Sequence, residues 1–188
     1  MRSKNMMGIA AGLAVATFTL GSYAIDLIKR PDMIFVKSGA SVMTDGSGYD
    51  VQNSMSKSFL VYKSQTFGIN LGWSKDGGHN IAVKKKSGSG NVVYGELVAI
   101  KVKDKWLKYA RRDNGINLSW SDSPVYEWKI EGGEANTPVQ LNQPAKIFST
   151  VENDNFIYCY RKTGAWLKWT KTCSTADLAA AKGGAPSF

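Results

Sequence analysis

The sequence has few of the residues that enzymes use for acid–base, nucleophilic or metal chemistry. Its 188 residues include one histidine, His79, and two cysteines. A single histidine excludes a cluster of histidine metal ligands and leaves a Ser-His-Asp triad dependent on one residue in a glycine-rich turn. The carboxylates of the central region are scattered, without the paired spacing of general acid–base catalysis: Asp104, Asp113, Asp122, Glu127, Glu131 and Glu134. We therefore expect no enzyme activity, no metal site and no cofactor.

Proline and acidic residues are also scarce, whereas glycine is plentiful. Five prolines exclude a proline-rich or collagen-like chain, and 19 glycines favour a domain with many turns. Lysine and arginine number 24 against 15 acidic residues, which gives a net charge of +9. This imbalance favours an anionic partner such as phospholipid headgroups, an acidic glycan or nucleic acid.

Residues 1–30 differ in composition from the rest of the chain. Two basic residues open them, and a 23-residue apolar stretch with one charge then runs from position 6 to 28, which is long enough to cross a bilayer. We expect a membrane anchor that includes Met6, Leu13, Phe18 and Ile28. The alternative is a signal peptide cleaved near Ala24, because small residues occupy positions 22 and 24. Either reading divides the chain into residues 1–30 and a domain of residues 31–188.

A seven-residue phrase occurs three times in this domain. It reads GINLGWS at 68–74, GINLSWS at 115–121 and GAWLKWT at 164–170. The glycines are 47 and 49 residues apart, and a tryptophan follows each glycine by five positions. Each phrase is preceded by a strand-like segment, so that Phe59-Leu60, Trp106-Leu107 and Phe156-Ile157 align. The pattern predicts three repeats, each containing a strand, a turn and a second strand.

Alternation within the phrases indicates which side of each strand is buried. In the second copy Ile116, Leu118 and Trp120 share one face, so we expect them in the core. Further strands are expected near 34–44, 79–85, 97–105, 125–130, 145–153 and 176–182. Twelve short strands in three units also allow a β-sandwich or an irregular barrel.

The phrase and the later segment Tyr126-Glu127-Trp128 resemble the ricin-type and fascin-like β-trefoil patterns over roughly residues 33–185. The resemblance implies an all-β domain, a β-trefoil of three four-stranded repeats. Together with the apolar segment at 6–28, it leads us to expect this trefoil to be preceded by an N-terminal hydrophobic helix. Glu127 stands where the ricin-type lectins carry glutamine, and the other two repeats lack the following tryptophan. These departures argue against the sugar site of those lectins.

The two cysteines are Cys159 and Cys173. A hairpin that turns near Gly164 places Cys159 opposite Lys168, and Cys173 then lies on the order of 16 Å further along the strand. That separation exceeds the reach of a disulfide, so we expect free thiols unless the chain bends after Trp169.

Two groups of residues are candidates for binding a partner. The first is basic and suits an anionic partner or a membrane surface: Lys84, Lys85, Lys86, Lys101, Lys103, Lys105, Lys108, Arg111 and Arg112. The second is an aromatic platform in the third repeat, comprising Trp166, Tyr158 and Tyr160.

These observations favour a non-catalytic interaction module held at a membrane by its N-terminal helix. Such a module would be an accessory or structural subunit of a membrane-associated assembly, in an exported or non-cytosolic compartment, with protein partners. The alternative is a secreted carbohydrate-binding protein, lectin-like or toxin-associated, released by cleavage near Ala24. Anionic lipids or glycans are possible partners, and export or anchoring argues against nucleic acid.

Overall fold

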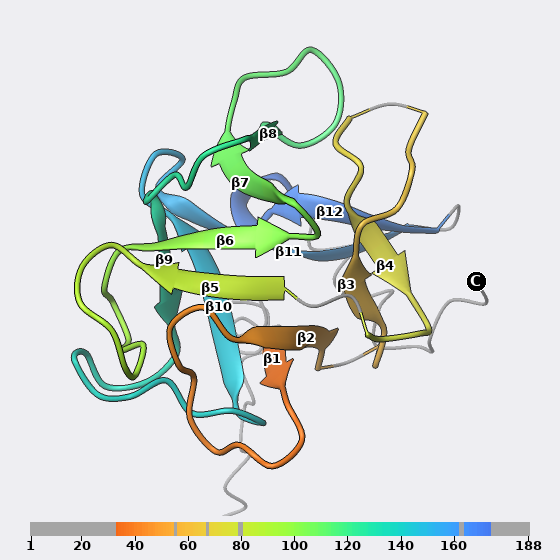
Figure 1. Ribbon diagram of the computed structural model, residues 1–188. Helices are drawn as coiled ribbons and strands as arrows, with labels where there is room; N and C mark the ends of the chain where they lie inside the picture. The colour runs from red at the N-terminus through yellow and green to blue at the C-terminus, as the bar shows by residue number, and fades with distance from the viewer. Residues whose placement is uncertain (1–32, 55, 67, 79–80, 162–163, 174–188) are drawn as a thin grey trace, which may run out of the picture.

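The computed structural model describes residues 33–173, with gaps at 55, 67, 79–80 and 162–163 (Figure 1). For residues 156–161 and 164–166 it describes the backbone alone. The described residues form twelve strands and one short 3-10 helix. The strands are β1 Met33–Val36, β2 Gly48–Asn53, β3 Phe59–Val61, β4 Gly72–Ser74, β5 Ile81–Lys85, β6 Val98–Val102, β7 Lys105–Tyr109, β8 Leu118–Ser121, β9 Trp128–Glu131, β10 Pro144–Ser149, β11 Asp154–Arg161 and β12 Gly164–Trp169; the 3-10 helix is Thr170–Thr172.

Six of the strands form a closed antiparallel barrel. The ring runs β1-β2-β5-β6-β9-β10 and returns to β1, and every neighbouring pair in it is antiparallel. The other six strands form three hairpins, β3–β4, β7–β8 and β11–β12, which follow and pair with the barrel strands β2, β6 and β10. Closure leaves the ring itself without an unpaired edge.

The predicted β-trefoil with an N-terminal helix is wrong, although the described chain is all-β. The structure is a closed six-stranded antiparallel barrel and contains no α-helix among the described residues. Residues 1–32, where the helix was expected, lie outside them, as does the whole of the strand expected at 176–182. The repeat pattern could not show that the pairs β2–β5, β6–β9 and β10–β1 join separate repeats into one ring, because pairing between distant strands leaves no local signal.

One end of the barrel is closed by the three loops that join its paired strands. The backbone N–H of Met43 donates to Val139 O, that of Val92 to Met43 O, and that of Val139 to Val92 O, each at 2.9 Å. All three side chains are fully buried. This cyclic set of hydrogen bonds seals the end, because the loops satisfy one another's backbone groups without water.

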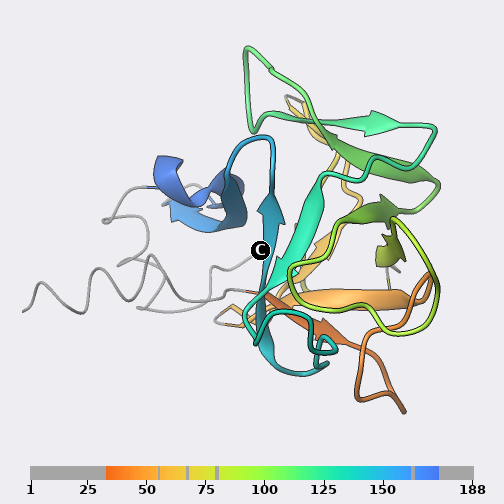
Figure 2. The same cartoon turned by 90° about the vertical axis from the view of Figure 1, so that its left-hand side faces the viewer.

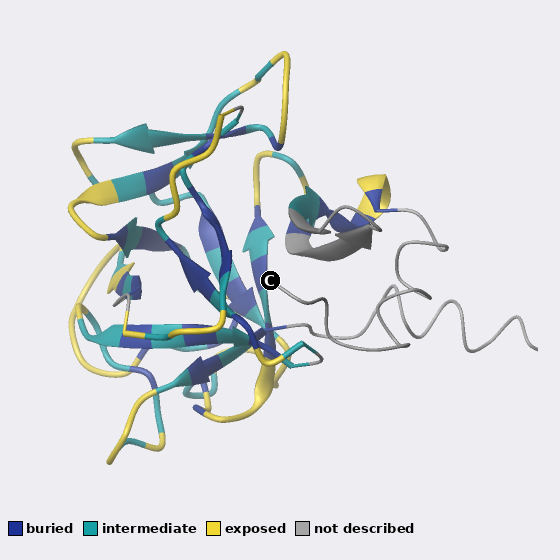
Figure 3. Ribbon diagram, turned by 90° about the vertical axis from the view of Figure 1, so that its right-hand side faces the viewer, coloured by how far each residue is buried: buried dark blue, intermediate teal, exposed yellow. Residues whose placement is uncertain are grey.

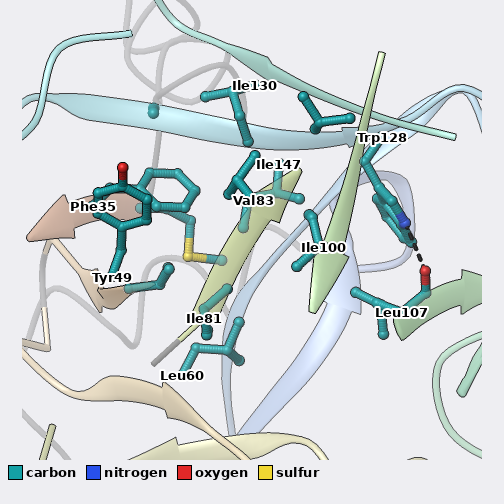
Figure 4. Packing of buried hydrophobic residues seen from close by; sticks show 14 of the residues in the cluster. Phe35, Tyr49, Leu60, Ile81, Val83, Ile100, Leu107, Trp128, Ile130 and Ile147 are labelled. Atoms are coloured by element: carbon teal, nitrogen blue, oxygen red, sulfur yellow. Dashed lines mark hydrogen bonds between the residues drawn. The ribbon is translucent and has the colours of Figure 1, made fainter. Parts of the chain in front are cut away.

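The interior of the barrel is filled with side chains. Figure 3 shows buried residues along the strands and exposed ones in the connecting loops. Figure 4 shows the packing, in which the Trp128 Nε1–H donates to Leu107 O at 2.9 Å and ties a hairpin to the barrel. The largest fully buried side chains are Trp128, Tyr49, Phe35, Met33, Met43, Ile81, Ile100, Leu107, Leu118, Ile130 and Ile147. A core filled in this way places binding on the outer surface or in the loops.

The glycines of the first two phrases meet where two hairpins approach each other. Gly68 and Gly115 have φ of +87° and +83°, and a Cβ on Gly115 would lie 3.1 Å from Gly68 Cα. Only glycine adopts this backbone without strain and also allows the close approach. Figures 1 and 2 show the two hairpin tips side by side.

The asparagines of the same phrases close the hairpin loops. Asn70 Oδ1 accepts the backbone N–H of Gln65 at 3.1 Å, and its Nδ2 donates to Tyr62 OH at 3.0 Å. Asn117 makes the equivalent bonds with Arg112 N and with Tyr109 OH, at 3.0 and 3.4 Å. The phrase therefore specifies a hairpin, not a duplicated ligand site.

The third hairpin has a different register from the one expected. Cys159 was expected opposite Lys168 but pairs with Trp166. Trp73 pairs with Leu60 and Trp120 with Leu107, whereas Trp169 pairs with Phe156. Tyr158 therefore holds the backbone position of Tyr62 and Tyr109. In the first two hairpins that tyrosine packs on the tryptophan of the next one, with ring centroids 5.9 Å apart for Tyr62–Trp120 and 6.4 Å for Tyr109–Trp169.

Cys173 is disulfide-bonded, so the expectation of free thiols is wrong. The chain contains one other cysteine, Cys159. The distance argument assumed a straight strand, but the chain turns at Trp169 into the 3-10 helix Thr170–Thr172. Thr170 Oγ1 then donates to Asn155 O at 3.1 Å, which brings this segment back against β11.

Candidate functional site

Two of the basic residues selected from the sequence are neutralised within the molecule. Lys85 Nζ lies 3.5 Å from Glu96 Oε1 and donates to Asn91 O at 2.7 Å, so this half-buried lysine fixes the loop between β5 and β6. Lys105 forms an ion pair with Asp122 across the β7–β8 hairpin. The hydrogen bond and charge of Asp122 raise the pKa of Lys105, and those of Lys105 lower the pKa of Asp122.

Two other lysines of the basic group selected from the sequence lie over aromatic rings, and outside that group Lys37 lies over Tyr49. Lys101 Nζ is 5.7 Å from the centroid of the Trp106 ring, and Lys103 Nζ is 4.4 Å from that of Tyr62. The strand register explains the first pair, because Lys101 is directly opposite Trp106. The second pair joins the β6–β7 turn to the β3–β4 hairpin. A cation held over a ring keeps its charge while its side chain is restrained.

Lys84 adds a third cation beside Lys101. Lys84 pairs with Ala99 and Lys101 with Ala82, so the two lysines are diagonal neighbours on one face of the β5–β6 pair. Neither they nor Lys103 has a carboxylate partner within ion-pair distance among the described residues. We call the three lysines, Tyr62 and Trp106 the basic face; β5 and β6 lie at the front of the view in Figure 1.

The remaining basic candidates are not part of this face. Lys86 is exposed after β5, and Arg111 is exposed in the β7–β8 loop. Arg112 is half-buried beside it, where its backbone N–H caps the loop by donating to Asn117. Lys108 is half-buried on β7; after Lys105 its charge also helps to lower the pKa of Asp122, and it partly opposes the burial that raises the pKa of Glu127.

Sequence inspection missed the two aromatic members of the basic face. Trp106 and Tyr62 were assigned only as strand residues of two separate repeats. The alternation of Lys101 and Lys103 with apolar residues predicted that both lysines are on the outer surface. Only the pairing of β6 with β7 shows that Trp106 lies beside Lys101. No local pattern links Tyr62 to Lys103, because that contact depends on how the hairpins pack.

Glu127, which prompted the comparison with lectins, has a structural role. Its Oε1 accepts the backbone N–H of Tyr109 and so attaches the end of β7 to the start of β9. Burial raises the pKa of this half-buried carboxyl, which the Tyr109 hydrogen bond and Lys108 partly oppose.

A second polar network joins the hairpin β7–β8 to the chain around β11. The carboxylate of Glu152 pairs with Lys171 and lies close enough to the Tyr109 hydroxyl to raise the pKa of Tyr109. The Lys171 bond lowers the pKa of Glu152, and the Glu152 bond raises that of Lys171. The Tyr109 ring packs on Trp169, so the network holds two hairpins together.

The aromatic platform and the membrane segment fall outside the residues described. For Trp166, Tyr158 and Tyr160 the backbone of the β11–β12 hairpin is described and the side chains are not. Met6, Leu13, Phe18 and Ile28 belong to residues 1–32, and His79 lies in a gap. Within the described ranges, no helix is long and apolar enough to span a membrane. The same ranges contain no group of three or more metal-ligating side chains.

No family model, curated protein or solved structure matches the chain.

Proposed function

We propose that the chain is a non-catalytic binding module whose basic face contacts an acidic protein partner. The observation that carries the proposal is the pair of ammonium groups above Trp106 and Tyr62. Their charges are not compensated by a carboxylate of the described chain, whereas Lys85, Lys105 and Lys171 each have one.

The rigidity of the basic face supports a binding role. Its lysines project from paired strands and a tight turn, in which Lys103 has φ of +54°. Side chains restrained before association lose less conformational freedom when a partner binds. Complementary charge also speeds encounter and favours acidic surfaces over basic ones.

The membrane setting of the proposal comes from the sequence. An anchor in residues 6–28 would make the domain an accessory or structural subunit of a membrane-associated assembly. The disulfide at Cys173 supports an exported, non-cytosolic location, because disulfides persist in oxidising compartments. The alternative is a secreted carbohydrate-binding protein, and the intact mass of the native chain decides between them: loss of about 24 residues at the N-terminus would indicate cleavage.

The basic face can be tested by removing its charge and leaving the fold intact. We expect the full chain with Lys84→Gln, Lys101→Gln and Lys103→Gln to elute from a heparin column at lower salt than the parent. Each exposed charge contributes about 0.5–1 kcal/mol to such contacts, so affinity should fall roughly tenfold to a hundredfold. Crosslinking in native membranes followed by mass spectrometry then identifies the partner, and acidic peptides crosslinked near Lys101 are expected.

A matched control separates this face from net charge alone. The exposed residues Lys57, Lys75 and Arg111 lie outside the basic face, and changing all three to glutamine removes the same charge. We expect this control to elute close to the parent. Equal losses in the two triple variants would refute a specific basic face.

A further inference from the structure

A hollow of about 620 Å³ lies on a part of the surface that the basic face does not include. It is lined by the loop between β9 and β10, by Tyr94, and by Ser54 just after β2. Met33 brings these segments together, because it pairs with Asn53 on one side and with Ala145 on the other. The volume is within the range of small-molecule sites.

The floor of the hollow requires two consecutive glycines. A Cβ on Gly133 would lie 2.2 Å from the Tyr94 ring, so the glycine backbone rests directly on that ring. Gly132 has φ of +125°, and its Cβ would lie 2.9 Å from Pro144 O. Any other residue at either position would push the loop away and change the shape of the hollow.

Tyr94 is itself firmly held, which makes the floor rigid. Its hydroxyl oxygen accepts the backbone N–H of Gln140 at 3.1 Å, its backbone N–H donates to Thr137 O at 2.9 Å, and its carbonyl accepts Asn136 N–H at 3.0 Å. The side chain is 4% exposed. A preformed floor reduces the ordering that a ligand would have to impose.

Three polar side chains around the hollow have no hydrogen-bond or ion-pair partner among the described residues: Ser54, Glu134 and Gln143. Two other polar side chains of the lining are engaged, since Thr137 Oγ1 donates to Glu134 O and Gln140 Nε2 donates to Pro138 O. The available groups are a hydroxyl, a carboxylate and an amide, which together donate and accept hydrogen bonds. The lining contains no lysine or arginine, and its one charge is negative, so it disfavours anions.

We propose that this hollow binds a neutral, hydroxyl-rich small molecule such as a single sugar residue. The hydroxyls of such a ligand would donate to Glu134 and to the Gln143 carbonyl oxygen and accept from the Gln143 amide and Ser54. The site is separate in position and charge from the basic face, and the proposal does not depend on what that face binds.

The test is a titration of the isotope-labelled full chain with glucose, galactose, mannose and N-acetylglucosamine, followed by amide chemical shifts. We expect at least one sugar to shift the amides of Gly132, Gly133 and Ser54. Glucuronate, which has similar size but carries a negative charge, should bind more weakly than glucose.

Substitutions of exposed side chains connect the shifts to the hollow. Gln143→Ala and Glu134→Ala should each weaken binding roughly fivefold or more, because each removes hydrogen bonds to the ligand. Lys84→Gln, on the basic face, should leave it unchanged. Absence of binding by all four sugars, or sugar binding that survives both alanine substitutions, would overturn the proposal.

Discussion

Single residues of the repeated phrase have separate structural tasks. The glycines Gly68 and Gly115 allow two backbones to touch, and Asn70 and Asn117 close the loops between paired strands. None of the four is a member of the basic face, although Asn70 also donates to the hydroxyl of Tyr62. The duplicated letters thus record a requirement for stability.

The close approach of Gly68 and Gly115 can be tested by the loss of stability when one methyl group is added at Gly115. Gly115→Ala should destabilise the protein by more than Gly88→Ala, although both glycines have positive φ, +83° and +74°. The left-handed backbone costs an alanine about 1–2 kcal/mol at either position. At Gly115 the new Cβ also meets Gly68 Cα at 3.1 Å, whereas nothing lies within 4 Å at Gly88. Denaturant unfolding compares the two, and equal losses would contradict the close approach.

The raised pKa of Glu127 gives a second prediction for a single residue. Because burial raises its pKa in the folded state, the ionised carboxylate reduces stability above that pKa, and the penalty disappears as the pH falls through it. Glu127→Gln keeps an oxygen to accept the Tyr109 N–H and removes the charge. We expect the variant to melt at a higher temperature than the parent at pH 7, with a gain that shrinks on acidification. A variant that is less stable at every pH would show that the charge itself holds β7 in place.

At the scale of elements, the sequence predicted the hairpin strands and missed a barrel strand. Tryptophan spacing and alternation located β3–β4, β7–β8 and β11–β12 because each is a local structure with a turn. The strand β2, GYDVQN, was missed although Tyr49, Val51 and Asn53 alternate as buried residues, because its intervening polar residues have low strand propensity. The register expected for β11 and β12 was wrong by two residues, because Cys159 pairs with Trp166 and not with Lys168.

The disulfide at Cys173 holds the chain that follows β12, and removing it should lower the stability of the protein. The loop between Cys159 and Cys173 spans 173 − 159 = 14 residues, and closing a loop of this length stabilises a fold by about 3 kcal/mol. Cys173→Ser should therefore lower the free energy of unfolding by about 3 kcal/mol, a change that denaturant unfolding can detect. Treating the parent with reductant should give a similar loss, whereas reductant should not affect the variant. Unchanged stability of the parent on reduction would contradict the predicted contribution.

At the scale of the whole molecule, closure of the barrel fixes where the basic face lies relative to β1. In the ring β1-β2-β5-β6-β9-β10, β6 stands three strands from β1 in both directions, so the two lie across the barrel. β6 carries Lys101, and β1 is the first described strand after the segment predicted to anchor the chain. The basic face and β1, the strand that follows the segment predicted to anchor the chain, are thus on opposite sides of the ring.

If residues 6–28 anchor the chain as predicted, this arrangement predicts that the basic face is turned towards a partner and not towards the membrane. Membrane insertion by the face is also disfavoured, because the one large hydrophobic side chain found exposed among the described residues is Val151, in the turn between β10 and β11. With the full chain reconstituted in vesicles, an amine-reactive reagent should modify Lys101 and Lys103 equally in neutral and in phosphatidylserine-rich bilayers, as read by peptide mass spectrometry. Added heparin should protect both lysines and leave Lys75 reactive. Protection by the anionic bilayer alone would instead mean that the face rests on its own membrane, since the attraction of a lysine to such a surface, about 1 kcal/mol, acts only within a Debye length.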